Sequence, residues 1–99
     1  MTLPEFTATL TQPTPPKDLS PLLTALWHDA KGDWRSAHGI AQTREGTNEY
    51  DRLHAYLHRK EGDASNARYW YRRAGAEVYG DTLEKEWEAL AMQALGCAE

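Results

Sequence analysis

The chain has 99 residues, of which 40% are hydrophobic and 26% charged, and it carries a formal net charge of −4 at pH 7. This length and composition indicate one globular domain. The negative charge argues against a general binder of double-stranded nucleic acid, which needs a basic surface to neutralise phosphates.

Cysteine usage and hydropathy exclude further classes of protein. The single cysteine, Cys97, rules out an internal disulfide and a zinc site made of cysteines alone. The N-terminus lacks the pattern of a secretory signal, and no apolar run approaches the ~20 residues of a membrane helix. The sequence therefore predicts a cytoplasmic protein with no membrane association.

Residues 1–18 contain four of the five prolines. Because proline cannot supply a helical hydrogen-bond ladder, we expect this segment to form an extended arm. Leu3, Phe6 and Leu10 could pin the arm to the body of the protein, and the alternative is a free tail. Residues 19–99 are then the single helical domain.

Apolar spacing and cap residues predict five helices after the arm, and no segment alternates like a strand. Ser20 caps the first helix, Gly32 ends it, and Asp33 caps the second. Gly39 weakens the second helix and is typical of a close helix contact. Asp81 and Glu84 resemble the capping box of the last helix. We predict an all-α fold with helices at 18–31, 34–44, 49–61, 64–75 and 81–95.

The chain also repeats itself at a spacing of thirty residues. The shift superposes leucines, alanines, histidines and the Gly-Asp turn, and it indicates two copies of one helix-turn-helix hairpin. The matched pairs are Leu23 with Leu53, Ala25 with Ala55, His28 with His58, Gly32-Asp33 with Gly62-Asp63, and Ala37 with Ala67.

The turn and second helix of each copy resemble the tetratricopeptide repeat (TPR), whose pattern is G-D-aromatic-x-x-A-x-x-x-aromatic-x-x-A. The resemblance covers residues 19–75. It implies two TPR-like hairpins whose first helices line a concave face, with the last helix in the place of the family's capping helix. The residues at the pattern's positions are Gly32, Asp33, Trp34, Ala37, Ala41 and Arg44 in the first copy and Gly62, Asp63, Ala64, Ala67, Tyr71 and Ala74 in the second.

The segment 54–75 also resembles a family of small uncharacterised bacterial proteins that carry an HxYLHRxEGDxxNAxYWYRRAG-type segment. This second resemblance implies no activity.

His54 and His58 lie one helical turn apart, and Glu61 follows three residues later. Two imidazoles and a carboxylate at this spacing can bind zinc or another divalent ion. However, His28 occupies the repeat-equivalent position of His58 and favours a packing role. We predict structural or surface histidines with no bound metal and no cofactor, and a metal site is the alternative.

The run from Tyr69 to Arg73 reads YWYRR, and together with Arg68, Arg59 and Lys60 it mixes aromatic and cationic side chains. Helical geometry turns Trp70 and Tyr71 inward and Arg68, Arg72 and Tyr69 outward, with Arg73 at the edge. Three interpretations remain open. The face is solvated and pairs with the acids of residues 77–99, it binds a peptide or an acidic partner, or it binds single-stranded nucleic acid.

From these patterns we predict a small interaction module that binds an unidentified protein or peptide in the groove lined by the first and third helices, with no catalytic residue. The alternative is a site for a small anion or metal, lined by histidine and arginine and open to an enzymatic role. Self-association as a homodimer is a further alternative. The predicted binding residues are His54, His58 and Arg59 on the third helix, and Tyr69, Arg72 and Arg73 as an adjoining basic rim.

Overall fold

The computed structural model describes residues 1–96, and Cys97 lies outside the described residues. Within that range the chain forms six α-helices and one short 3₁₀ helix, with no strand. The all-α prediction is therefore confirmed. Across the same range, no helix combines the length and the apolar character that spanning a lipid bilayer requires.

All five predicted helices begin or end one to three residues away from the expected positions, and an additional α-helix precedes them. The elements are α1 (Leu3–Ala8), η1 (Thr9–Thr11), α2 (Pro21–Ala30), α3 (Trp34–Gln42), α4 (Asn48–Lys60), α5 (Ala64–Arg73) and α6 (Leu83–Leu95).

Short turns join four of the helices in pairs, with α2 packed along α3 and α4 along α5. The turns pass through Gly32 and Gly62, whose φ angles of +85° and +89° lie in the left-handed region that glycine adopts without steric cost. Asp33 and Asp63 then accept a backbone N–H bond in the first turn of α3 and α5. These turns and caps agree with the sequence prediction.

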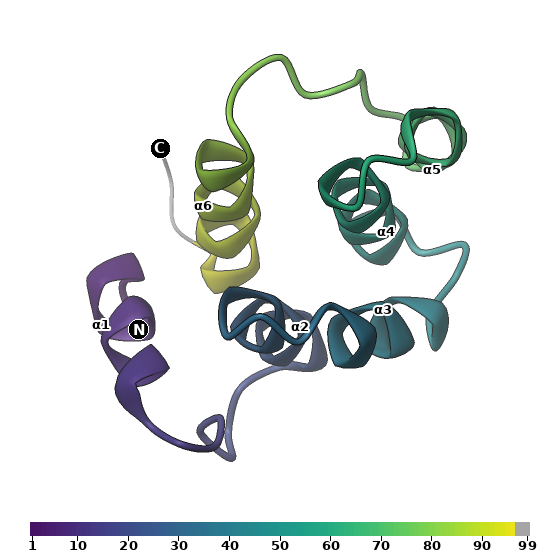
Figure 1. Ribbon diagram of the computed structural model, residues 1–99. Coiled ribbons are helices and arrows are strands. Elements are labelled where there is room, and N and C mark those ends of the chain that lie inside the picture. The colour runs from purple at the N-terminus through teal and green to yellow at the C-terminus, as the bar shows by residue number, and fades with distance from the viewer. Residues whose placement is uncertain (97–99) are drawn as a thin grey trace.

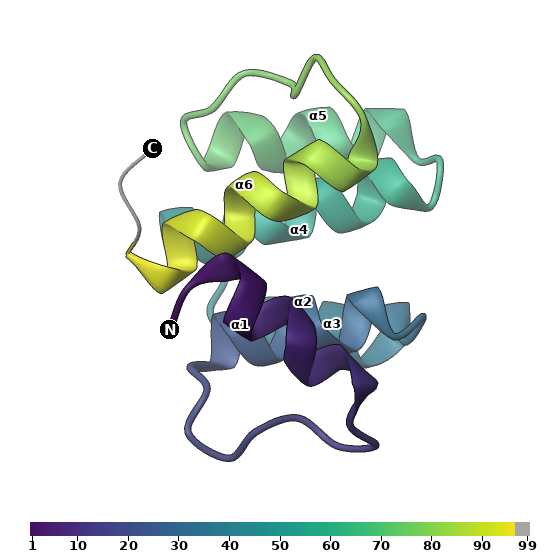
Figure 2. The same ribbon diagram turned by 90° about the vertical axis from the view of Figure 1, so that its left-hand side faces the viewer.

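The last helix, α6, lies against both α2 and α4 rather than extending the row of helices beyond α5 (Figure 1). Trp87 and Leu90 of α6 are buried, and the indole Nε1 of Trp87 donates a hydrogen bond to the Leu26 carbonyl of α2 at 2.9 Å. Figure 2 shows α1 crossing beside α6 on the face that points away from α5. The face that α2 and α4 share is thus covered by α6.

The extended conformation predicted for residues 1–18 is wrong for their first half. Thr2 and Glu5 form a capping box, Pro4 occupies the first turn, where its missing N–H is tolerated, and α1 follows. Phe6 is fully buried and stacks on Trp87 with ring centroids 5.7 Å apart. The first half of the segment therefore packs on the rest of the fold, and of the two alternatives the structure shows the one in which Phe6 pins the segment.

The cap of α6 also differs from the prediction. The side chain of Thr82, not Asp81, accepts the backbone N–H of Lys85 at 3.1 Å. The Asp81 side chain instead accepts the backbone N–H of Thr82, a contact in the loop just before the N-cap.

Alanine substitutions of one turn glycine, Gly62, and one helical glycine, Gly39, are expected to have opposite effects on stability. Gly62→Ala is expected to lower the free energy of unfolding by about 1–2 kcal/mol, because an L residue is strained at that φ. Gly39→Ala is expected to raise the free energy of unfolding by roughly 0.5–1 kcal/mol, because alanine favours the helical conformation more than glycine does. The added Cβ causes no clash, since it would meet nothing within 4 Å. The same absence of neighbours shows that Gly39 marks no close helix contact.

Urea unfolding of both variants checks this pair of expectations. Equal stability of Gly62→Ala and the parent chain would contradict the account of the turn.

Candidate functional site

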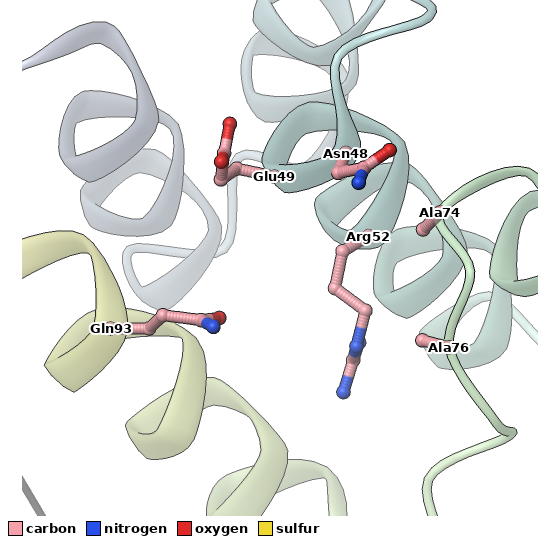
Figure 3. A pocket seen from close by; sticks show the side chains of 6 residues that line it. All are labelled: Asn48, Glu49, Arg52, Ala74, Ala76 and Gln93. Atoms are coloured by element: carbon pink, nitrogen blue, oxygen red, sulfur yellow. The ribbon is translucent and has the colours of Figure 1, made fainter.

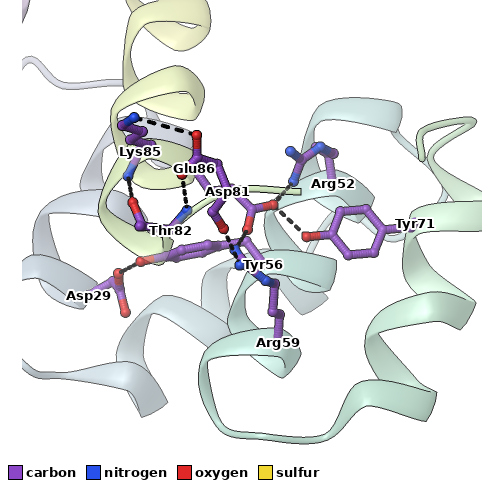
Figure 4. Close-up of polar contacts among 9 residues, drawn as sticks. All are labelled: Asp29, Arg52, Tyr56, Arg59, Tyr71, Asp81, Thr82, Lys85 and Glu86. Carbon is purple, nitrogen blue, oxygen red and sulfur yellow. Dashed lines mark hydrogen bonds and ion pairs between the residues drawn. The ribbon is translucent and has the colours of Figure 1, made fainter. Parts of the chain in front are cut away.

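The face shared by α2 and α4, which was expected to line a peptide groove, is closed by a buried ionic cluster centred on Glu86 of α6. The Glu86 side chain is fully buried. Arg52 and Arg59 of α4 donate to its two carboxylate oxygens at 2.5 and 2.7 Å, and the Tyr71 hydroxyl of α5 donates at 2.5 Å. Figure 4 shows these three side chains converging on Glu86.

This cluster accounts for Arg59, one of the predicted binding residues. Its guanidinium also donates to the Asp81 carbonyl in the loop before α6. Burial, followed by the bond to Glu86, raises the pKa of the Tyr71 phenol above its ordinary value, so Tyr71 remains a donor. Arg59 therefore joins α4 to α6 and is not free to form the wall of a groove.

A second buried contact joins α2 to α4 on the same side. The Tyr56 hydroxyl donates to Asp29 at 2.6 Å (Figure 4). The Lys60 ammonium lies 2.9 Å from the other carboxylate oxygen. Burial, together with this bond, raises the pKa of Tyr56. The buried carboxylates of Asp29 and Glu86 are thus each paired with a cationic side chain of the same chain.

His54 and His58 point to the opposite side of α4, where they meet His38 of α3. Their exposed fractions are only 2% and 7%. The Nε2 atoms of His38 and His54 lie 2.9 Å apart, and the rings of His54 and His58 are stacked with centroids 4.9 Å apart. One nitrogen from each of the three rings lies within 4.8 Å of the others. We call these three residues the histidine cluster.

Two tryptophans enclose the histidine cluster. Trp70 of α5 stacks on His54 at a centroid distance of 3.8 Å, and Trp34 stacks on His38 at 4.6 Å. Trp34 also donates its indole N–H to the Leu57 carbonyl at 2.7 Å, which holds α3 against α4. The cluster is therefore built into a rigid aromatic layer between α3, α4 and α5.

The surroundings keep two of these imidazoles neutral. Burial, and then the neighbouring His38, His58 and Arg73, lowers the pKa of His54 to about 4. Burial and His58 likewise lower the pKa of His38. At neutral pH, each of these two rings therefore keeps a nitrogen lone pair.

The outer face of α5 carries the predicted basic rim. Tyr69, Arg72 and Arg73 are exposed, as is Arg68 one turn earlier, whereas Trp70 and Tyr71 are buried. Arg73 lies over the rings of both Tyr69 and Trp70, at 5.8 and 4.9 Å from their centroids. We call Arg68, Tyr69, Arg72 and Arg73 the α5 face.

A cavity of about 330 Å³ lies between the start of α4, the end of α5 and α6. Figure 3 shows Arg52 extending from α4 into this space, opposite Gln93 of α6. Arg52 pairs with Glu86, but Glu86 also pairs with Arg59, so these three side chains keep a net charge of +1. Glu49, which also lines the cavity, offsets that charge, and the predicted histidines do not line the cavity.

The structure thus divides the predicted site residues into three separate groups. His54 and His58 join the histidine cluster, Arg59 joins the buried Glu86 cluster, and Tyr69, Arg72 and Arg73 share the α5 face. Sequence reasoning missed His38, although it lies one turn after Trp34 and the two share a face of α3. No family model, curated protein or solved structure matches the chain.

Proposed function

We propose that this protein is a small cytoplasmic, TPR-like interaction module that binds an acidic segment of a partner protein across the α5 face. One observation supports the proposal above the others. Arg68, Arg72 and Arg73 are exposed, and none of them forms an ion pair with another residue in the described part of the chain. Three like charges on adjacent turns attract a carboxylate-rich segment.

The electrostatics of the rest of the fold strengthen this choice of surface. The acids of the last helix could have paired with α5, but the buried Glu86 is neutralised by two arginines of α4 instead. Lys85 and Asp81 pair with each other. The positive charge of the α5 face is therefore left for an external partner.

The aromatic neighbours prepare the face for binding. The guanidinium of Arg73 donates to the Tyr69 hydroxyl at 3.3 Å and packs over the Tyr69 and Trp70 rings. This stacking restricts the rotamers of a long side chain, so less conformational entropy is lost when a carboxylate binds. Tyr69, with 45% of its surface exposed, also supplies apolar area to a docked peptide.

A protein partner suits this surface better than single-stranded nucleic acid. Nucleic acid recognition of that kind relies on several aromatic rings that stack successive bases. Tyr69 is the only exposed aromatic side chain of α5, because Trp70 and Tyr71 are buried.

The proposal is tested by fluorescence anisotropy with a labelled octaglutamate peptide. We expect binding that weakens as the ionic strength rises from about 0.05 to about 0.3 M, because salt screens exposed charges. Arg72→Ala/Arg73→Ala is expected to reduce the affinity by about tenfold, since it removes two charge-assisted contacts.

Two controls make the anisotropy experiment specific, and two outcomes would contradict the proposal. An octaglutamine peptide should not bind, and Arg35→Ala, which removes an exposed charge on α3, should leave the affinity unchanged. Tighter binding of oligothymidylate than of octaglutamate would overturn the choice of partner. A sedimentation coefficient that rises with concentration and falls in Arg72→Ala/Arg73→Ala would show that the α5 face contacts a second copy instead.

A further inference from the structure

The histidine cluster has a feature that neither the fold nor the α5 face requires. Three imidazole rings from two helices bring one nitrogen each to a common region, with mutual distances of 4.8 Å or less. The Nδ1 atom of His54 is buried and has no hydrogen-bond partner among the described residues. Burying this polar atom without a partner lowers stability, so packing alone does not explain why a histidine rather than an apolar residue stands at position 54.

We propose that His38, His54 and His58 form a binding site for a divalent transition-metal ion that prefers imidazole ligands, with Zn²⁺ as the representative ion. Three neutral imidazoles are a common protein ligand set for Zn²⁺, and the fourth position can hold a water molecule. This inference is independent of the proposed binding of an acidic partner.

The distances fit such an ion after small movements. Zn–N bonds of about 2.0–2.1 Å in a tetrahedral centre place the nitrogens roughly 3.3 Å apart. The Nε2 atoms of His38 and His54 stand at 2.9 Å and must separate slightly. The nitrogen of His58 lies within 4.8 Å of the other two, so any distance above about 3.3 Å must shorten. Rotation of the His38 ring supplies much of this adjustment, because His38 is only half-buried on the surface of α3.

Glu61 supplies the supporting contact that metal-bound histidines usually have. Its Oε2 lies 3.3 Å from Nδ1 of His58. A proton on this Nδ1 is then shared with the carboxylate, and the lone pair of Nε2 is free for the metal. A carboxylate in this position fixes the tautomer and orientation of the ring and increases its basicity.

The backbone and the tryptophans hold the ligands in place. His54 and His58 are one turn apart on α4, a spacing that directs both side chains to one side of the helix. Trp70 and Trp34 stack on His54 and His38 and limit access of water from two sides. His38, the most exposed ligand, provides the route by which an ion reaches the site.

A second group of possible ligands consists of His58, Glu61 and Asp63, so it has His58 in common with the histidine cluster. Two observations favour the histidine cluster over this group. Asp63 already accepts the N–H of Asn66 as the cap of α5, and both carboxylates are exposed to competing water. Carboxylates also suit harder ions better than imidazoles do.

The test is a titration of the metal-free protein with ZnCl₂, followed by calorimetry and by thermal unfolding. We expect one bound ion per chain and a Tm raised by about 10 °C or more when free Zn²⁺ exceeds Kd a hundredfold. Titration with Co²⁺ should give the strong visible absorption of a tetrahedral centre and quench tryptophan fluorescence, because Trp70 adjoins His54.

Four variants decide the location of the ion. His38→Gln, at a half-buried surface position, should abolish the Tm shift, and Glu61→Gln should weaken binding by about tenfold. His28→Gln, outside the cluster, and Asp63→Asn, which can still cap α5, should leave binding intact. The proposal is overturned if the parent chain shows no Zn²⁺ shift, if His38→Gln keeps it, or if Asp63→Asn loses it.

Discussion

Replacing Glu86 by alanine is expected to lower the free energy of unfolding by about 3–5 kcal/mol. The substitution leaves Arg52 and Arg59 without their carboxylate and removes the acceptor of the Tyr71 hydroxyl. Because the Glu86 side chain is fully buried, water cannot readily replace these contacts. Urea unfolding followed by circular dichroism measures the loss.

Glu88→Ala is the matched control for this prediction. Glu88 is exposed on the same helix and forms no ion pair among residues 1–96, so its removal should change stability by less than about 0.5 kcal/mol. A cost below about 1 kcal/mol for Glu86→Ala would show that the ionic cluster does not hold α6 against α4.

Phe6→Ala is expected to destabilise the protein by about 3–5 kcal/mol, as large-to-small substitutions of buried aromatic residues do. The Phe6 ring is fully buried and stacks on Trp87 of α6. The same unfolding experiment measures the effect. It also tests whether α1 belongs to the cooperative unit, since a free N-terminal tail would make the substitution neutral.

Met1→Ala serves as the control for Phe6. Met1 lies in the same segment but keeps 58% of its surface exposed, so the change should be within about 0.5 kcal/mol of the parent chain. Equal effects of the two substitutions would contradict the burial of α1.

The helical hairpin positions could be predicted because their signals are local. Ser20, Asp33 and Asp63 each cap the helix that the sequence predicted them to cap. Gly96 ends α6 in a left-handed conformation, directly after the predicted helix end at residue 95. Capping depends on residues within one turn of each other, so spacing alone is sufficient to detect it.

The N-terminal helix escaped prediction although its signal was present. Thr2 and Glu5 form the T-x-x-E pattern of a capping box, and Pro4 stands in the first turn, where proline is favourable. The prolines farther along, at 13, 15 and 16, dominated the composition of residues 1–18. Composition over the whole segment thus concealed a local pattern within its first third.

The candidate site was predicted only where one helix determines it. The outward direction of Arg68, Tyr69 and Arg72 follows from the helical period of α5, and the structure places all three at the surface. The contacts of His54 with His38, and of Arg59 with Glu86, join segments far apart in the chain. No spacing rule reveals such pairs, because they depend on how α3 and α6 dock against α4.

The most direct test of the proposed recognition surface is the change in backbone amide NMR shifts of the ¹⁵N-labelled protein on titration with octaglutamate. We predict the largest changes along α5, from Arg68 to Arg73, with α6 and the buried side of α4 unchanged, because the Glu86 cluster keeps the α2 and α4 face closed. The largest changes in α6 and at Leu53 would show that the peptide displaces α6, and would contradict the account.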